Sequence, residues 1–371
     1  MTKILRIITR LNIGGPSKQI LTLNSIFDGP EFEQTLIVGK VEPSEMEVNY
    51  SSLKNLIKID SLRRGVNPVF DLVAFIKICV ILHKYRPNII HTHLSKAWAF
   101  GVLAKILVAP KTKLVHTFHG HILHSYFSGL SQIMILNFQR FLASKTDVLV
   151  AVNETIRADL ISNQIGVKSN FEIAYPGFNA PQKIDSETAR STLGLQGDSF
   201  TVGFIGRFEK IKRPDILAEV VKLTSASADR VQFLFCGGGS LYQELQRQIA
   251  GFPAICLPWT DDLSTFYSSI DLMILVSDNE GTPLTIIEAG KVGVPTLTRN
   301  VGGIKGLISD SLNGFIVSDS SIEIADKISQ IMGNKQLLQG VSKEAELYFN
   351  KKFSEEVFLQ TYKRIYCSLV D

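Results

Sequence analysis

Short runs of β-branched and apolar residues alternate with helical patterns along the chain, and the alternation begins again after residue 200. Strand-like runs separated by amphipathic helices are typical of a parallel sheet with helices on both faces. A chain of 371 residues is long enough for two such domains. Its 45% hydrophobic and 20% charged residues exclude a disordered, collagenous or disulfide-scaffold chain. The sequence therefore predicts an α/β protein with two doubly wound domains.

The predicted elements form two series, one in each half of the chain. The first series of strands is Ile4–Ile8, Thr35–Val38, Ile89–His91, Leu114–Thr117 and Val148–Val152. The second is Thr201–Ile205, Val231–Cys236, Ala254–Leu257, Leu272–Val276 and Thr296–Thr298. The helices predicted between them are Lys18–Phe27, Phe70–Tyr85, Ser95–Leu107, Pro214–Ser225, Leu241–Ile249, Leu263–Ser269 and Thr285–Val292.

A segment rich in Pro, Gly, Ser and Asn, residues 174–198, separates the two series. We therefore predict a first domain over residues 1–177 and a second over residues 178–353. The amphipathic pattern near the end predicts a helix within residues 354–371 that packs back onto the first domain. Because ligands of doubly wound sheets bind beyond the carboxyl ends of the strands, we expect the two domains to face a cleft.

Charge is divided unevenly between the halves. Residues 1–180 carry 20 Lys and Arg against 12 Asp and Glu, residues 51–150 carry 13 against 3, and residues 181–371 carry 19 against 23. A basic half is attracted to anionic lipid, which leaves peripheral contact with a membrane open. Nucleic acid is the alternative electrostatic partner, but no recognition motif supports it.

The sequence also limits the location of the protein. The most apolar helical stretch, residues 70–82, is shorter than the roughly 20 apolar residues that span a bilayer. The four cysteines are widely separated and form no CxxC pair, which fits a reducing cytosol. We therefore expect a cytoplasmic protein, with peripheral attachment to the inner face of the cell membrane as an open possibility.

Two junctions in the first half could carry chemistry. The segment NIGGPS, residues 12–17, follows the first strand; its glycines and the helix after it suit an anion, although a simple glycine turn is the alternative. All seven histidines lie between His83 and His124, with H-x-H pairs at two strand ends. Imidazoles bind metals, but neighbouring strand residues point to opposite faces and no carboxylate lies near. We therefore favour a polar cleft wall over a metal site.

Two junctions in the second half carry charge. The segment GRFEKIKRP, residues 206–214, follows a strand and offers Arg and Lys to a phosphate, with a solvated charge run as the alternative. In residues 278–290, Glu280 is expected to close a strand and Glu288 to lie in the first turn of a helix that Thr285 opens. A buried Glu288 needs a partner, which sugar hydroxyls would supply. An acid placed against the helix macrodipole is the alternative.

Together these junctions resemble the retaining nucleotide-sugar glycosyltransferases with the GT-B fold, glycosyltransferase family four, which includes bacterial capsule and lipopolysaccharide transferases. The resemblance covers the whole chain. Glu280 and Glu288 match the E-x7-E motif, and Val301-Gly302-Gly303 matches the glycine turn that follows it. GGPSKQI near the start and VHTFHGH in the middle complete the combination. The resemblance implies two Rossmann-like domains that face an interdomain cleft.

The resemblance assigns four catalytic residues. His119 would contact the transferred sugar of the donor. Arg207 and Lys212 would neutralise the diphosphate and the charge that grows on it as it leaves. Glu280 would contact the hydroxyls of the transferred sugar.

The resemblance also assigns residues that bind the donor. Gly15 would offer its amide to the diphosphate, and the backbone at Leu284 and Thr285 would complete the phosphate site. Glu288 would bind both ribose hydroxyls, and Trp259 lies where the family holds the base.

The implied activity is transfer of a hexose or N-acetylhexosamine from a nucleoside-diphosphate sugar, most simply a UDP-sugar. The implied acceptor is a glycan or a lipid-diphosphate-linked glycan of bacterial surface polysaccharide. Fixed cations and helix dipoles stabilise the leaving group, so neither a metal nor a cofactor is expected. A sugar-nucleotide epimerase of the same fold, a metal-dependent hydrolase with a histidine cluster and a non-catalytic sugar-nucleotide sensor remain alternatives.

Overall fold

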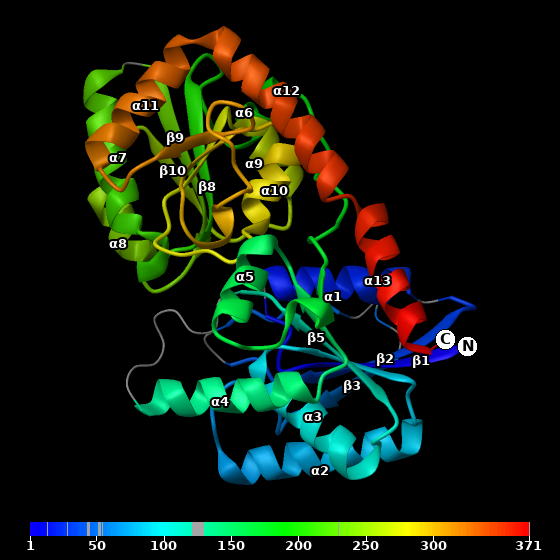
Figure 1. Cartoon of the computed structure of the whole chain (residues 1–371). Coiled ribbons are helices and arrows are strands. Elements are labelled where there is room, and N and C mark those ends of the chain that lie inside the picture. The colour runs from blue at the N-terminus through cyan, green and yellow to red at the C-terminus, as the bar shows by residue number, and fades with distance from the viewer. Residues whose placement is uncertain are drawn as a thin grey trace. The chain divides into compact units, whose positions relative to one another are not determined.

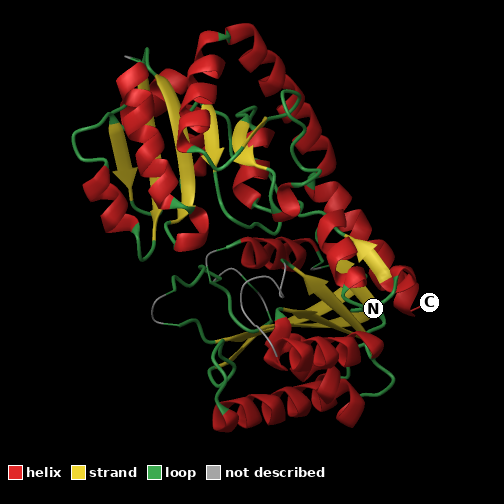
Figure 2. Ribbon diagram, turned by 60° about the vertical axis from the view of Figure 1, so that its left-hand side comes forward, coloured by secondary structure: helices red, strands yellow, loops and turns green. Residues whose placement is uncertain are grey.

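The computed structural model describes residues 1–370 apart from residues 13, 28, 43–44, 51–52, 54, 121–129 and 229. The chain divides into two compact units. Unit 1 is Met1–Phe178 with Glu355–Asp371, and unit 2 is Asn179–Ser354. Each unit has one parallel sheet with helices on both of its faces (Figures 1 and 2). The prediction of an α/β chain with two doubly wound domains is confirmed.

Unit 1 contains a seven-stranded sheet in the order β3-β2-β1-β4-β5-β6-β7, with all neighbours parallel. Its strands are β1 Thr2–Ile8, β2 Phe32–Gly39, β3 Leu56–Ile59, β4 Ile89–His93, β5 Lys113–Phe118, β6 Val148–Ala151 and β7 Phe171–Ile173. Its helices are α1 Gly15–Ile26, α2 Pro68–Tyr85, α3 Ser95–Val108, α4 Leu130–Ser144, α5 Glu154–Ser162 and α13 Glu355–Val370, with the 3₁₀ turn η1 Lys168–Asn170.

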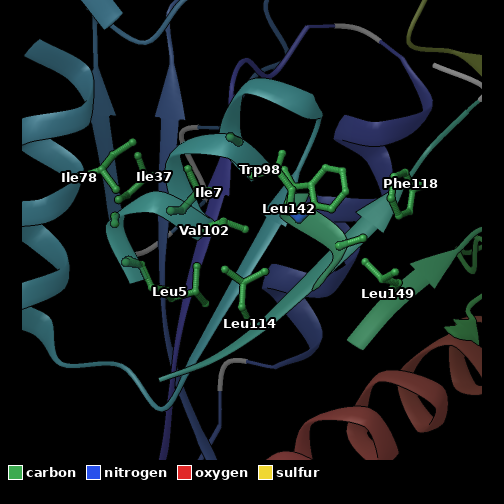
Figure 3. Packing of buried hydrophobic residues seen from close by; sticks show 14 of the residues in the cluster. Leu5, Ile7, Ile37, Ile78, Trp98, Val102, Leu114, Phe118, Leu142 and Leu149 are labelled. Atoms are coloured by element: carbon green, nitrogen blue, oxygen red, sulfur yellow. The ribbon is translucent and has the colours of Figure 1, made fainter. Parts of the chain in front are cut away.

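Two apolar layers hold the helices of unit 1 against its sheet. Alternate strand residues point to opposite faces, so Leu5 and Leu114 contact the layer that includes α2, α3 and α4 (Figure 3). On the other face, Ile4 belongs to a second cluster with residues of α1 and α13. Tyr362 and Tyr366 of α13 are fully buried in this second cluster. The last helix of the chain is thus part of unit 1.

Local sequence explains where α2 begins and ends. The side chain of Asn67 accepts hydrogen bonds from the backbone N–H groups of Val69 and Phe70, both at 3.1 Å. Pro68 occupies the first helical position, where its missing N–H costs nothing. The helix ends at Arg86, which has a left-handed backbone with φ of 49°. The helix predicted from Phe70 therefore starts two residues earlier, because the cap precedes the apolar pattern.

Unit 2 contains a six-stranded sheet in the order β10-β9-β8-β11-β12-β13, again with all neighbours parallel. Its strands are β8 Phe200–Arg207, β9 Val231–Gly238, β10 Ala254–Leu257, β11 Leu272–Leu275, β12 Thr296–Arg299 and β13 Phe315–Val317. Its helices are α6 Ser186–Thr192, α7 Pro214–Ser227, α8 Tyr242–Gln248, α9 Leu263–Ser269, α10 Leu284–Lys291, α11 Ser321–Gly333 and α12 Lys335–Lys352, with 3₁₀ turns η2 Lys210–Lys212 and η3 Gly302–Ile304.

Three edge strands, β3, β7 and β13, are absent from the predicted series. Each has only three or four residues, so its strand period is weak. No helix among the described residues is long and apolar enough to span a bilayer. All four cysteines are free thiols.

Candidate active site

The switch point of the unit 2 sheet lies between β8 and β11. From β8 the chain proceeds to β9 on one side, and from β11 it proceeds to β12 on the other side. A doubly wound sheet opens a crevice at this point, outside the carboxyl ends of its strands. The two charged junctions that the sequence singled out follow β8 and β11, so they meet at this crevice.

Backbone contacts join the two junctions. The backbone N–H of Asp278, in the loop after β11, donates to the carbonyl of Ile211 in η2 at 2.9 Å. Asp278 also accepts from Arg213 at 3.2 Å and from Arg299 at 2.7 Å, so its carboxylate links the ends of three connections. This arrangement fixes η2 beside the loop that carries Glu280.

Lys212 and Glu280 form a direct ion pair at the crevice. Lys212 Nζ donates to Glu280 Oε1 at 2.5 Å, and Ser277 Oγ donates to the same oxygen at 2.6 Å. The side chains are only 20% and 10% exposed. A half-buried ammonium can donate to a phosphate, and a carboxylate held by Lys and Ser can accept from hydroxyl groups. The pair therefore places a donor for a phosphate, Lys212, next to an acceptor for hydroxyl groups, Glu280.

A glycine turn supports the backbone of Glu280. Gly303 N–H donates to the Glu280 carbonyl at 2.8 Å. Gly302 has φ of 49°, and a Cβ there would lie 2.3 Å from the same carbonyl oxygen. Only glycine fits this position without moving Glu280. The predicted position of Glu280 at a strand end is wrong, because β11 stops at Leu275 and the polar loop after it carries Glu280.

Arg207 is the last residue of β8 and is exposed. It has an electrostatic effect on Glu209, whose carboxylate accepts from the Ser240 hydroxyl at 2.7 Å. That hydrogen bond holds the pKa of Glu209 below its usual value, and Arg207 adds to the shift. Arg207 thus lies at the carboxyl end of the central strand β8 but is not part of the Lys212–Glu280 ion pair.

Glu288 lies on α10 and is buried, with 5% of its surface exposed. Tyr267 donates its hydroxyl to Glu288 Oε2 at 2.8 Å. Burial, and after it the Glu288 charge, hold the pKa of Tyr267 well above its usual value, so the phenol stays a donor. The prediction of Glu288 in the first turn is wrong: α10 begins at Leu284, which makes Glu288 its fifth residue. Glu288 is therefore not an acid placed in the first turn against the helix macrodipole. The hydrogen-bond partner that its burial requires is Tyr267.

The N-terminus of α10 carries Leu284 and Thr285 in its first turn, and no side chain caps it. The preceding Pro283 takes the N-cap position and has an extended backbone. The first N–H groups of a helix have no partner within the helix and carry a partial positive charge. This end of α10 therefore suits an anion, which is the role that the family resemblance implies for the backbone of these two residues.

Trp259 follows β10 and packs beside a glycine turn that the sequence analysis did not single out. A Cβ at Gly238 would lie 3.1 Å from the Trp259 indole nitrogen. Gly237 has φ of 146°, and a Cβ there would lie 1.9 Å from the Gly206 carbonyl oxygen. Gly237 and Gly238 are the last residues of β9 and pair with Gly206 and Arg207 of β8, so the missing side chains allow the ends of these two strands to lie close together. Three consecutive glycines directly after a predicted strand were the signal that could have identified this glycine turn.

In unit 1, Gly15 is the first residue of α1, whose N-terminus has no side-chain cap. Gly14 takes the N-cap position. The helix follows β1, which neighbours β4 at the switch point of the unit 1 sheet. Gly15 is therefore placed at an uncapped helix end, as the anion prediction requires, and Ile13 of the same motif lies outside the described residues.

Histidines separate onto the two faces of the unit 1 sheet, as strand geometry predicts. His116 stacks on Trp98 with ring centroids 4.3 Å apart, and its Nδ1 contacts Thr92 Oγ1 at 2.9 Å. It is part of the core. On the other face, His93 Nδ1 contacts His119 Nε2 at 2.9 Å, while His121 and His124 lie outside the described residues.

The His93–His119 hydrogen bond couples the tautomers of the two rings. Burial lowers the pKa of His119 to about 3 and that of His93 well below its usual value, so both rings are neutral. A neutral imidazole carries one proton. When His93 Nδ1 donates, His119 carries its proton on Nδ1; when His93 accepts, His119 Nδ1 is an acceptor. His119 Nδ1 is buried and has no hydrogen-bond partner among the described residues.

A second buried network, absent from the sequence analysis, ties α13 to the sheet beneath these histidines. Arg6 Nη1 donates to His91 Nδ1 at 3.0 Å and to the Tyr366 hydroxyl at 2.8 Å. Since a guanidinium only donates, His91 Nδ1 accepts and His91 Nε2 donates to Thr117 Oγ1 at 2.8 Å. Thr117 contacts the Tyr362 hydroxyl at 3.0 Å. The network fixes the tautomer of His91, whose ring lies 4.1 Å from that of His93.

No group of three or more His, Cys, Asp and Glu side chains that could hold a metal ion occurs within the described part of the chain. The charged site built from β8, β11 and α10 therefore has cations, a helix end and two carboxylates as its chemical groups. Such a site in a doubly wound domain is suited to an anionic ligand that also carries hydroxyl groups.

Comparison with known proteins identifies the class more closely. Residues 33–180 match the sequence family described as Glycosyltransferase Family 4, and residues 185–348 match the family described as Glycosyl transferases group 1. The chain therefore belongs to the GT-B glycosyltransferases of family four, and it is an enzyme of the transferase class.

Curated relatives and solved structures agree with this assignment. The chain is 25% identical, over 71% of each chain, to "UDP-Gal:alpha-D-GlcNAc-diphosphoundecaprenol alpha-1,3-galactosyltransferase" of Escherichia coli. It is 20% identical to the Staphylococcus aureus "Capsular polysaccharide biosynthesis glycosyltransferase CapM", over 82% of this chain and 83% of that one. In fold it matches Anabaena HepE in complex with UDP and glucose, with a TM-score of 0.81, 19% identity and coverage of 99% of this chain and 100% of that one.

Proposed function

We propose that this chain is a retaining, metal-independent glycosyltransferase of bacterial surface-polysaccharide assembly. It transfers a hexose or N-acetylhexosamine from a UDP-sugar to a glycan carried on a lipid diphosphate. The observation that carries the proposal is the Lys212–Glu280 ion pair at the switch point of unit 2. One relative is named for a UDP-Gal donor and a diphosphoundecaprenol-linked acceptor. This name supports the donor and the acceptor that we propose.

In this proposal the cations and helix ends of unit 2 bind the donor diphosphate. Lys212 and Arg207 neutralise it, and the backbone at Leu284 and Thr285 donates to its oxygens at the start of α10. In unit 1, the Gly15 amide contributes in the same way. Fixed donors of this kind stabilise a leaving group where negative charge develops, without a metal.

The remaining residues recognise the rest of the donor. The Glu280 carboxylate accepts from the hydroxyls of the transferred sugar, and the neutral His119 ring accepts from or donates to them. Glu288 binds the ribose hydroxyls, oriented by Tyr267, and Trp259 packs against the base. A buried carboxylate that already accepts one hydroxyl proton is suited to accept others.

The proposed reaction replaces one bond at the anomeric carbon. The bond between C1 of the sugar and the phosphate oxygen breaks, and its electron pair goes to the phosphate. The acceptor hydroxyl oxygen forms a new bond to C1 from the same face, and its proton passes to the departing phosphate. Lys212 and Arg207 stabilise the phosphate as its charge grows.

A donor screen tests this proposal. Thermal unfolding is measured with UDP-, GDP- and ADP-sugars in the presence of EDTA, since a ligand that binds the native state raises the melting temperature. We expect UDP-sugars to stabilise the protein and transfer to follow when an acceptor is added. Inversion at a sugar carbon without transfer would indicate the epimerase. Binding of a sugar nucleotide without any product would indicate a sensor. Hydrolysis that EDTA abolishes, without transfer, would indicate a metal-dependent hydrolase.

A further inference from the structure

Helix α2 of unit 1 has apolar side chains on two opposite sides. Ala74, Ile78 and Leu82 face the sheet and are buried. The opposite side carries the outer face of α2, which we define as Val69, Leu72, Val73, Ile76 and Val80, all of them exposed. A surface helix that is apolar on its outer side needs an apolar environment there as well.

The exposure of this face is large. Leu72 is 59% exposed and Ile76 is 52% exposed, one turn apart on the helix. Spacings of three and four residues place the five side chains of the outer face in one stripe along the helix. The stripe is continuous, so it differs from single apolar residues scattered over a surface.

Cations flank the outer face. Lys77 and Lys84 are exposed and lie seven residues apart, which places them along one side of the stripe. Near the start of the helix, the guanidinium of Arg63 lies 4.2 Å from the centre of the Phe70 ring, and Arg64 is 55% exposed. Long basic side chains beside apolar ones can lie along a bilayer surface with their charges at the lipid phosphates.

Acidic groups around the face are few, and two of them form ion pairs while the third, Asp60, is exposed. Residues 51–150 contain three acidic residues against thirteen basic ones. Asp71 of α2 pairs with Lys96 at 2.7 Å, and Asp147 pairs with Lys105 at 2.6 Å. A second copy of this chain docked through the same face would bring lysines together without carboxylates to pair them. The charge pattern therefore favours an anionic surface over self-association.

We infer that the outer face of α2 inserts into the surface of an anionic bilayer, with Lys77 and Lys84 at the lipid phosphates. The inference rests on the proposed function for its purpose, because a lipid-diphosphate-linked acceptor resides in a membrane. The helix lies in the plane of the bilayer surface, as amphipathic surface helices do. Unit 1 is then the part of the chain that meets the acceptor.

Vesicle flotation tests this inference without any sugar nucleotide, so it is independent of the transfer reaction. The full chain is mixed with vesicles of phosphatidylglycerol and phosphatidylethanolamine or with vesicles of phosphatidylcholine alone. We expect binding to the anionic vesicles that high salt weakens, and little binding to the neutral ones. Failure of the full chain to bind the anionic vesicles would overturn the inference.

Two variants of the outer face are compared with matched controls. L72S/I76S should lower partitioning to anionic vesicles at least about tenfold. Its control I322S/L347S replaces apolar residues of α11 and α12 that are 63% and 57% exposed, and it should bind like the wild type. In K77Q/K84Q, partitioning to anionic vesicles should fall about fivefold for each lysine that is replaced. Its control K335Q/K343Q changes exposed lysines of α12 and should partition to anionic vesicles like the wild type.

The same variants separate the inference from the proposed function. Because the substituted residues are exposed, all variants should keep the wild-type melting temperature. Transfer to a water-soluble acceptor should also be unchanged, whereas transfer to a vesicle-embedded acceptor should fall with partitioning. Equal binding by L72S/I76S and the wild type would refute the inference. So would a wild-type dimer that L72S/I76S converts to monomers, since the face would then be a protein interface.

Discussion

The variant Lys212→Met should separate the contribution of the Lys212–Glu280 ion pair to stability from its contribution to catalysis. The pair is 2.5 Å long, with side chains 20% and 10% exposed, so removing the ammonium leaves Ser277 as the side-chain donor to Glu280 among the described residues. Loss of one partner costs about 3–5 kcal/mol in a fully buried pair and up to about 1 kcal/mol in an exposed pair. This half-buried pair lies between these limits, and we expect a loss of about 2 kcal/mol in the free energy of unfolding.

The catalytic loss should be larger. In the proposed reaction Lys212 stabilises the charge that develops on the leaving phosphate. Removal of one such donor lowers kcat by about 10²–10³, or about 3–4 kcal/mol of transition-state stabilisation. The double variant K212M/E280Q removes the uncompensated carboxylate, so its stability should recover to within about 1 kcal/mol of the wild type. Its activity should stay low.

Steady-state transfer to a water-soluble acceptor and urea unfolding are measured on the same samples. The matched control is Lys105→Met in unit 1, which removes the ammonium from a pair 2.6 Å long with side chains 14% and 25% exposed. It should lose similar stability and keep the wild-type kcat. Wild-type kcat in Lys212→Met, or an equal loss of kcat in Lys105→Met, would refute the role of Lys212.

Gly302→Ala should lower kcat at least about tenfold, since its Cβ would lie 2.3 Å from the Glu280 carbonyl and displace that residue; Gly306→Ala, with φ of 77° and open space around it, should cost only about 1 kcal/mol of stability. Glu288→Gln should weaken UDP binding about tenfold in calorimetry, and an unchanged Kd would contradict the ribose role. Burial holds the pKa of His119 at about 3, so the native ring stays neutral while the unfolded chain binds a proton below about pH 6.5. The free energy of unfolding should therefore be constant above that pH and fall below it, by up to about 1.4 kcal/mol per pH unit for each such histidine; a flat urea-unfolding profile from pH 7.5 to 5 would contradict this.

The central strands of both sheets could be predicted from the sequence, and so could the edge strand β10, but the edge strands β3, β7 and β13 could not. Central strands such as β8 are continuous apolar runs because helices cover both of their faces. The edge strand β13 has three residues and no period of its own, and it is a strand only because β12 pairs with it. The boundaries of α10 shifted by one residue, which was enough to move Glu288 from the first turn to the second.

The site could be predicted as separate residues but not as contacts. Lys212 and Glu280 are 68 residues apart, and they meet because β8 and β11 are neighbours in the sheet. Tyr267 and Ser277 escaped prediction, because a single hydroxyl among apolar neighbours forms no charge pattern or period. The buried network of Arg6 was not predicted for a different reason. A cation in a strand sequence is usually expected to face solvent, whereas Arg6 is hydrogen-bonded to His91 and Tyr366.

We propose that the chain transfers a sugar with retention and without a metal. The direct measurement is proton NMR of the product formed from a UDP-α-sugar and a soluble acceptor in the presence of EDTA. We expect a new glycosidic bond with the α configuration and release of UDP, at a rate that added divalent cations do not change. A β-linked product, or transfer that stops in EDTA and returns with a divalent cation, would contradict it.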